Sequence, residues 1–130
     1  MSGRSIRVVV VDDGPSFRKA ATAFLATQPH VDVVGAFESG LEAIEAAALL
    51  SPDLILMDLH MPGMTGLNAT RAIKRFNATV KVVAVTLYDR DWHRSAALDA
   101  GADGFISKAS FTEACPPILA ALAAEIAPSR

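Results

Sequence analysis

Cysteine is almost absent from this sequence, and several other features are missing with it. Cys115 is the single cysteine, which excludes an internal disulfide and a cysteine-rich zinc site. No apolar run approaches the roughly 20 residues that a membrane span requires, and a net charge of −2 offers no basic surface for nucleic acid. The sequence also lacks internal repeats and low-complexity linkers. We therefore expect a globular domain of the cytoplasm.

The composition that remains favours one compact unit. The chain has 130 residues, of which 52% are hydrophobic and 20% are charged. This balance excludes general disorder, and the length suits a single hydrophobic core. We predict one domain that covers residues 1–130.

Short apolar runs alternate with longer amphipathic segments along the chain. The runs interpreted as buried strands cover residues 6–11, 31–37, 54–57, 80–85 and 104–107. The segments interpreted as helices cover approximately residues 15–28, 39–50, 65–76, 89–100 and 110–127. Five alternations of strand and helix predict an α/β fold, with a parallel sheet and helices on both of its faces.

Two of the predicted helices begin with capping signals. Ser39 is followed by Glu42 three residues later, which is the pattern of a capping box, and Thr65 is suited to cap the next helix. The apolar residues of these helices, which we expect to face the sheet, are Leu41, Ile44, Ala48, Leu49, Leu67, Ala69, Ile73 and Phe76. The residues expected at the solvated surface are His30, Arg71, Lys74, Arg75 and His93.

The last helix contains two prolines that conflict with its expected start. Ser110 and Glu113 match a capping box that would begin the helix at residue 111, but Pro116 and Pro117 would then lie inside it at ~3 kcal/mol or more each. We therefore predict a late start near residue 115, or a distinct break there. The residues expected to face the sheet are Ile118, Leu122 and Ile126, with Leu119 on an apolar outer strip. That strip is either an exposed alanine helix or a partner surface.

The stretch from residue 52 to residue 66 organises the rest of the chain. Residues 54–57 form an unbroken apolar run between turn formers, as in strands that are buried on both faces of a parallel sheet. Asp58 follows this run, so its carboxylate lies at the carboxyl end of a central strand, where open α/β sheets place ligand sites. A lone aspartate there is more often a turn residue, and the other strand ends must decide between the two interpretations.

Polar side chains end four of the five predicted strands. They are Asp12, Asp13, Asp58, Thr86 and Lys108. At one edge of a parallel sheet the three carboxylates would repel each other and favour a hard dication. Oxygen ligands without histidine or cysteine favour Mg²⁺ or Ca²⁺ over Zn²⁺, and Mg²⁺ leaves positions open for phosphoryl oxygens. A lysine and a threonine nearby would complete a phosphoryl site, with a carboxylate as its nucleophile because no serine or cysteine has a base beside it.

These residues belong to a pattern that extends over the whole chain. Its pieces are Val11-Asp12-Asp13, the segment from Asp58 to Gly66 with Met61-Pro62, Val85-Thr86, and the segment from Ala100 to Phe105 that leads to Lys108. In this combination and order, the chain resembles the receiver domain of bacterial two-component response regulators. In detail it is most similar to receivers that carry a helix-turn-helix output domain. The resemblance implies a doubly wound, flavodoxin-like sheet of five parallel strands in the order 2-1-3-4-5.

The resemblance also implies a role for each matching residue. Asp58 would accept a phosphoryl group from a histidine kinase, and Thr86 and Lys108 would contact that group. The ligands implied for Mg²⁺ are Asp12, Asp13, Asp58 and the backbone carbonyl of His60. Phe105 would be the aromatic side chain that rotates when the hydroxyl of Thr86 turns toward the new anion. Such a local change of packing is suited to bias a two-state element.

Four positions depart from the family pattern or vary within the family. Gly14 stands where related receivers often have a polar residue or a histidine, and Leu87 stands where a small residue is common. Leu87 is therefore expected to narrow the access to Asp58 and to slow phosphoryl exchange. His60 and Tyr88 occupy the two variable positions that tune dephosphorylation in the family. None of these departures removes a chemical requirement of the site.

Two other functions compete with a phosphorylation-controlled switch. An aspartyl-phosphate phosphatase or phosphotransferase would resemble Asp-x-Asp enzymes with an inserted cap domain. Here Asp58-Leu59-His60 lacks the second aspartate, and 130 residues leave no room for the cap. The other alternative is a degenerate receiver that acts only as a binding module, and the complete set of acidic, threonine and lysine residues argues against it. The expected switch catalyses its own phosphorylation and dephosphorylation and is not a metabolic enzyme.

The resemblance implies partners as well. A sensor histidine kinase would supply the phosphoryl group. Apart from the resemblance, we expect a homodimer through the last helix or the face of the fourth helix. DNA would be contacted only through an output domain that this chain does not contain, and no membrane contact is expected. We expect a truncated form of a longer transcription regulator rather than a stand-alone receiver.

Overall fold

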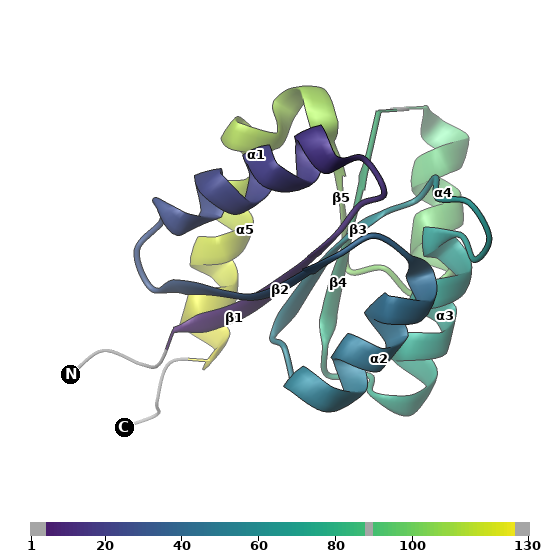
Figure 1. Ribbon diagram of the computed structural model, residues 1–130, viewed down its shortest axis with the longest axis horizontal. Coiled ribbons are helices and arrows are strands. Elements are labelled where there is room, and N and C mark those ends of the chain that lie inside the picture. Colours follow the sequence, from purple (N-terminus) through teal and green to yellow (C-terminus); the bar gives the residue numbers. More distant parts are fainter. Residues whose placement is uncertain (1–4, 88–89, 127–130) are drawn as a thin grey trace.

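Five parallel strands form a single sheet with helices on both of its faces (Figure 1). The computed structural model describes residues 5–87 and 90–126 of the chain. The strands are β1 (Ile6–Val11), β2 (Val31–Phe37), β3 (Leu54–Asp58), β4 (Lys81–Thr86) and β5 (Gly104–Ser107). Their order across the sheet is β2-β1-β3-β4-β5, which confirms the predicted α/β class and the implied strand order.

The helices divide unequally between the two faces of the sheet. They are α1 (Pro15–Ala26), α2 (Gly40–Leu50), α3 (Gly66–Phe76), α4 (Asp91–Asp99), the short 3-10 helix η1 (Lys108–Ser110) and α5 (Phe111–Ile126). Helices α1 and α5 cover one face, and α2, α3 and α4 cover the other (Figure 1). The predicted start of the fourth helix at residue 89 lies outside the described residues. Among the described helices, none combines the length and the apolar character needed to cross a membrane.

The run of valines in β1 separates two layers of the core. Val8 and Val10 belong to the cluster with α1 and α5, whereas Val9 and Val11 belong to the cluster with α2 and α3. Successive side chains of a strand point to opposite faces, so a strand covered on both sides needs an unbroken apolar run. The apolar runs of β1 and β3 are therefore the signature of central strands, and all five residues of β3 are buried.

The two predicted helix caps are present. The Ser39 hydroxyl oxygen accepts a hydrogen bond from the Glu42 N–H at 3.1 Å, and the Thr65 hydroxyl oxygen accepts one from the Asn68 N–H at 3.2 Å. The return bond of the first cap differs from the standard capping box. The Glu42 carboxylate accepts from the N–H of Glu38, one residue before the cap, at 3.0 Å.

The prediction of which residues of α2 and α3 face the sheet is partly wrong. In α2 the fully buried residues are all small. The predicted inward residues that prove exposed are Leu41, Ala48, Leu49 and Phe76. Those that are buried or half-buried are Ile44, Leu67, Ala69 and Ile73. The residues of α2 that are buried are Gly40, Ala43, Ala46 and Ala47. Only small side chains allow so close an approach, since a Cβ added at Gly40 would come within 2.9 Å of the Met64 carbonyl oxygen.

Lys74 was expected to be solvated, but it lies in a hydrogen-bond network. Its ammonium donates to the Asp103 carboxylate at 2.9 Å, to the Val80 carbonyl at 2.7 Å and to the Ala78 carbonyl at 3.1 Å. The network connects the end of α3 to the segments that precede β4 and β5, because Asp103 also accepts from the Val82 N–H. The two arginines of the same helix face are exposed, as predicted.

Helix α5 runs without a break from Phe111 to Ile126, so the predicted late start or break is wrong. Pro116 and Pro117 lie inside the helix and remove the N–H donors that would bond to the carbonyls of residues 112 and 113. Both residues that carry these carbonyls are exposed, which leaves the two acceptors accessible to water. The helix therefore starts at residue 111, as the capping pattern of Ser110 and Glu113 indicated, and it tolerates both prolines in its interior.

The early start of α5 also changes which residues face the core. The buried residues are Phe111, Cys115, Leu119 and Leu122. Leu119 is 5% exposed and does not lie on an outer strip, while Ile118 and Ile126 pack at the margin of the same cluster. The predicted inward position is confirmed for Leu122 and, at the margin, for Ile118 and Ile126. The prediction misplaced only Leu119, because it took the phase from residue 118 onward and left Phe111 out of the helix.

Leu119→Ala is expected to lower the free energy of unfolding by about 2–5 kcal/mol, because it leaves a cavity in the core beneath α5. Leu49→Ala is the matched control, since Leu49 also lies in a helix but is 82% exposed, and its effect should stay within about 0.5 kcal/mol. Denaturant unfolding of both variants measures the difference. Similar small losses for the two would show that Leu119 is not a core residue.

Candidate functional site

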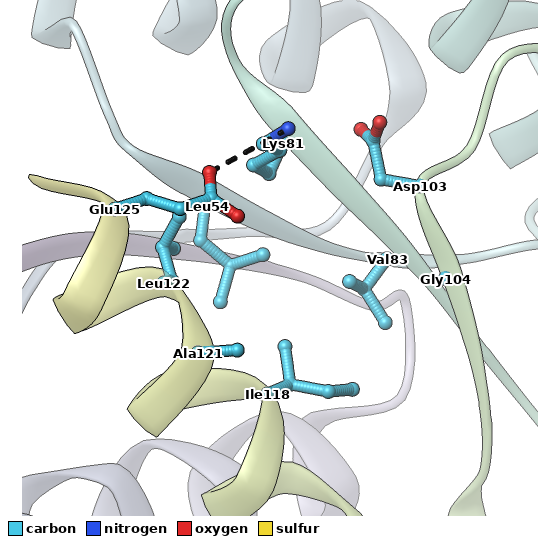
Figure 2. A pocket seen from close by; sticks show the side chains of 9 residues that line it. All are labelled: Leu54, Lys81, Val83, Asp103, Gly104, Ile118, Ala121, Leu122 and Glu125. Atoms are coloured by element: carbon cyan, nitrogen blue, oxygen red, sulfur yellow. Dashed lines mark ion pairs between the residues drawn. The ribbon is translucent and has the colours of Figure 1, made fainter.

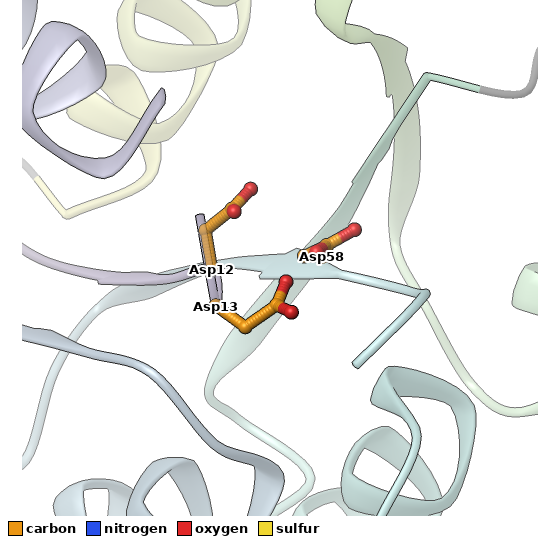
Figure 3. A group of neighbouring side chains, drawn as sticks. All are labelled: Asp12, Asp13 and Asp58. Carbon is orange, nitrogen blue, oxygen red and sulfur yellow. The ribbon is translucent and has the colours of Figure 1, made fainter. Parts of the chain in front are cut away.

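The carboxyl ends of β1, β3, β4 and β5 bring the predicted polar residues to one edge of the sheet. Asp12 and Asp13 follow β1, Asp58 ends β3, Thr86 ends β4 and Lys108 follows β5. One carboxylate oxygen from each of the three aspartates lies within 4.8 Å of the other two, and Figure 3 shows these side chains gathered at the strand ends. The structure thus assembles the acidic cluster and places the lysine beside it.

Asp12 is the most strongly fixed member of this cluster. It is 2% exposed, and its Oδ1 accepts a hydrogen bond from the Gly14 N–H at 2.8 Å. Its Oδ2 lies 2.6 Å from the Lys108 ammonium, and its backbone carbonyl accepts from the Arg18 guanidinium at 2.6 Å. Asp13, by contrast, is exposed to solvent. The cluster therefore has one anchored acid and one open acid beside the buried Asp58.

Lys108 lies between two carboxylates and an aromatic ring. Its Nζ is 2.6 Å from Asp12 Oδ2 and 3.8 Å from Asp58 Oδ2, and it lies 4.7 Å from the centroid of the Phe17 ring. The side chain is only 12% exposed. The ammonium is thus engaged mainly by Asp12 and has a second acid, Asp58, within a short displacement.

The environment of Asp58 disfavours its ionised form. Burial raises the pKa of this carboxyl to about 6, and the negative charge of Asp12 acts in the same direction. The His60 N–H, which donates to Asp58 Oδ1 at 3.2 Å, and the Lys108 charge lower the pKa but do not offset the increase. A carboxylate crowded in this way is stabilised by any added positive charge, and such a shifted pKa is typical of functional sites.

A hollow of about 580 Å³ opens over the acidic cluster. The residues that line it are Asp12, Asp13, Gly14, Phe17, Asp58, His60, Leu87, Lys108 and Ala109. Leu87 follows β4 directly and is 69% exposed. The hollow has room for a phosphoryl group beside the carboxylates, and Leu87 forms part of its wall.

A second hollow, of about 220 Å³, lies at the opposite edge of the sheet, between α5 and the amino ends of β3, β4 and β5 (Figure 2). Its apolar lining consists of Leu54, Val83, Ile118, Ala121 and Leu122. Its charged groups already have partners: Lys81 lies 3.8 Å from Glu125, and Asp103 binds Lys74. No cluster of acidic side chains lines this second hollow within the described part of the chain. Among the described residues, the cluster that could bind a cation lies at the carboxyl ends of the strands.

Thr86 and Phe105 lie on the same face of the sheet, toward α4. Thr86 is completely buried. Phe105 pairs with Ala84, which lies two residues before Thr86 in β4, so the three side chains point to the same side. The guanidinium of Arg94, from α4, lies 4.6 Å from the centroid of the Phe105 ring. Tyr88, the second variable position that the resemblance implies, lies outside the described residues.

His93 was expected at the surface, but it is only 6% exposed and lies next to His60, in the loop that follows β3. Its ring centroid is 5.3 Å from that of His60 and 3.6 Å from that of Trp92, on which it stacks. Burial, followed by the charges of His93 and the site lysine, lowers the pKa of His60. The signal for burial was present in the sequence, because His93 precedes the buried Ala97 by four residues on α4.

The family model and the similar proteins identify the same family. The model of the response regulator receiver domain matches residues 8–115. The response regulator protein VraR of Staphylococcus saprophyticus is 46% identical over 103 residues, which cover 79% of this chain and 49% of that protein. The response regulator GacA of Pseudomonas viridiflava is 45% identical over 103 residues, which cover 79% of this chain and 48% of that protein. The chain thus spans about half the length of these curated relatives.

Solved structures agree with the sequence relatives. The response regulator domain of Thermotoga maritima CheB superposes with a TM-score of 0.80 at 35% sequence identity, and the match covers 92% of this chain and 94% of that one. Both the residues that match and the fold that they adopt lead to the same conclusion. The chain belongs to the family of response regulator receiver domains of two-component systems.

Proposed function

We propose that this domain is a phosphorylation-controlled switch whose phosphoacceptor is Asp58. The supporting observation is the position of its carboxylate, which is buried, lies 3.8 Å from the Lys108 ammonium and shares the strand edge with two other acids. One carboxylate oxygen of Asp58 attacks the phosphorus of a phosphohistidine on a sensor histidine kinase. A P–O bond forms, the P–N bond breaks, and its electron pair stays on the imidazole nitrogen, which takes up a proton.

The acidic cluster fits Mg²⁺ as the cofactor of this reaction. Three carboxylate oxygens lie within 4.8 Å of one another and no histidine or cysteine joins them, which is the donor set of a hard cation. The residues that would hold the ion are Asp12, Asp13, Asp58 and the backbone carbonyl of His60. When bound, Mg²⁺ supplies positive charge that offsets both the crowded acids and the phosphoryl oxygens.

Lys108 and Thr86 respond to the new anion. Lys108 shifts its ammonium from Asp12 to the phosphoryl oxygens, and the Thr86 hydroxyl turns to donate a hydrogen bond to one of them. The space that this hydroxyl vacates lies on the side of the sheet that also carries Phe105. The aromatic ring rotates into it and leaves its contact with Arg94. The event at Asp58 thereby changes the surface of β5 and α4.

The output of the switch is the control of transcription through an output domain of the kind that longer response regulators carry. This proposal is supported by the relatives, which are response regulators of which the matched residues cover only 48–49%. DNA is contacted only by that output domain, and the whole regulator acts in the cytoplasm. A homodimer forms through the last helix or through the α4 face, where Trp92 and Leu98 are 64% and 53% exposed.

Acetyl phosphate with Mg²⁺ should add one phosphate to the domain, and Asp58→Asn should abolish the addition, because Asn lacks the nucleophilic oxygen. Intact-mass spectrometry measures the uptake, and chelation of Mg²⁺ with EDTA serves as the control that should suppress it. Equal uptake by the Asn variant would move the phosphoacceptor to another residue.

Asp58→Asn should also raise the free energy of unfolding in metal-free buffer, by up to about 3 kcal/mol at pH 7.5, at about 1.4 kcal/mol per pKa unit. The carboxyl has a pKa of about 6 in the folded protein against an ordinary value of 3.8. Its contribution to stability is complete below the lower value and is lost as the pH rises through the higher one. The gain from Asn should therefore be about twice as large at pH 7.5 as at pH 5.0. Denaturant unfolding at the two pH values measures it.

Asp13→Asn is the matched control for this stability measurement. It removes the same charge from an exposed position, where solvent screens the repulsion, so its gain should be much smaller. Equal gains for the two variants, or a gain for Asp58→Asn that does not change with pH, would contradict the effect of burial on Asp58.

Leu87→Ala should accelerate both labelling by acetyl phosphate and the subsequent hydrolysis, because the smaller side chain widens the mouth of the hollow. Leu98→Ala is the control, since Leu98 is an exposed leucine of α4 that does not line this hollow. Both rates follow from time courses of intact mass. Rates of Leu87→Ala that match those of the control would remove the steric argument.

A further inference from the structure

The aromatic ring of Phe17 lies beside the charged end of Lys108. The ring centroid lies 4.7 Å from Nζ, while two carboxylates lie on its other sides at 2.6 and 3.8 Å. An ammonium over the face of an aromatic ring is attracted by the negative charge density of the ring. The ammonium of a lysine is mobile because its side chain is long and flexible. The face of the Phe17 ring restricts the positions that the ammonium can occupy, but it does not fix the ammonium to one of the two acids.

Phe17 is itself held in place from two directions. It lies in the first turn of α1, two residues after the Pro15 that begins the helix. Its ring packs edge-on against Phe111 at a centroid distance of 5.3 Å and an angle of 79°. Phe111 is 5% exposed and begins α5, three residues after Lys108. The orientation of the Phe17 ring is therefore determined by the core, while its face remains available to the hollow.

We propose that Phe17 is a positioning residue for phosphoryl transfer, which keeps the ammonium of Lys108 within reach of both Asp12 and Asp58. This inference rests on the proposed function of Asp58. In the structure Asp12 holds the ammonium more closely than Asp58 does. The lysine must exchange one partner for the other when the phosphoryl group arrives. The ring provides a surface along which the ammonium moves between the two acids without turning out into the solvent.

Phe17 packs against the core cluster beneath α1, and an aliphatic residue would serve that purpose as well. Phe24 provides the comparison, because it also lies on α1 and also packs edge-on against Phe111, at 5.8 Å. Phe24 does not line the hollow. Both phenylalanines pack against Phe111, but only for Phe17 does the structure show a contact with Lys108. Their leucine variants therefore separate a positioning role from a packing role.

The first test compares labelling rates with acetyl phosphate and Mg²⁺ by intact mass. Phe17→Leu should reduce the initial rate by about three- to tenfold, the range of a cation–π contact of intermediate burial. Phe17→Tyr, which keeps an aromatic face, and Phe24→Leu should each stay within about twofold of the wild type. Equal reductions for Phe17→Leu and Phe24→Leu would overturn the proposal, because they would report only a weakened core.

A double-mutant cycle shows whether Phe17 acts through the lysine. In a Lys108→Met background, Phe17→Leu should cause no further loss of rate. Losses that multiply would mean that Phe17 affects the reaction by another route and would refute the positioning role.

A magnetic-resonance measurement tests the placement of Lys108 without phosphorylation. The ε-methylene protons of Lys108 should show an upfield ring-current shift that disappears in Phe17→Leu and persists in Phe24→Leu. A shift that does not depend on Phe17 would overturn the proposal even where Asp58 is labelled normally. Conversely, a wild type that takes up no phosphate on Asp58 would overturn the proposed function, while the ring-current shift would still decide where Phe17 holds the lysine.

Discussion

The crowding of three carboxylates at one end of the sheet is the constraint on which the rest of the site depends. Two of these acids, Asp12 and Asp58, are almost completely buried, and water therefore screens their repulsion poorly. Lys108 supplies a single positive charge and shares it unequally between them. The folded domain thus keeps an unbalanced negative charge, which favours a cation and distinguishes this edge from the remaining surface.

The topology of the sheet determines where this charge collects. The chain order reverses between β1 and β3, which lie next to each other although β2 separates them in sequence. At such a switch point the connections leave in opposite directions and open a crevice at the carboxyl ends of the strands. Asp12 follows one of these strands and Asp58 ends the other. The acids meet because of this reversal, and the helices on both faces supply the packing that holds the strands in register.

Sequence patterns predicted the strands and their polar ends well, because both depend on short-range chemistry. A run of β-branched residues in β1 or a run such as Leu54–Met57 has few alternatives to a buried strand. The helix faces were harder, since alanine and leucine are both apolar and only tertiary packing decides which lies inward. Leu49 and Leu119 were therefore placed on the wrong sides of α2 and α5. The dual role inferred for Phe17 could not be seen either, because a residue on the apolar face of a helix carries no sign that a lysine from η1 will reach it.

The two prolines of α5 divide this helix into parts of unequal strength. The carbonyls of residues 112 and 113 lack the backbone donors that residues other than proline would provide at positions 116 and 117, so fewer backbone hydrogen bonds join the first turn to the rest of the helix. Local opening of a protein follows such weak boundaries and does not require global unfolding. The backbone amides of the turn that follows Lys108 should therefore exchange their hydrogens with solvent through a separate local opening. The free energy of that opening should be lower than for the amides near Leu122. We therefore expect the element next to the acidic cluster to open as a small cooperative unit of its own, attached to a more rigid helix.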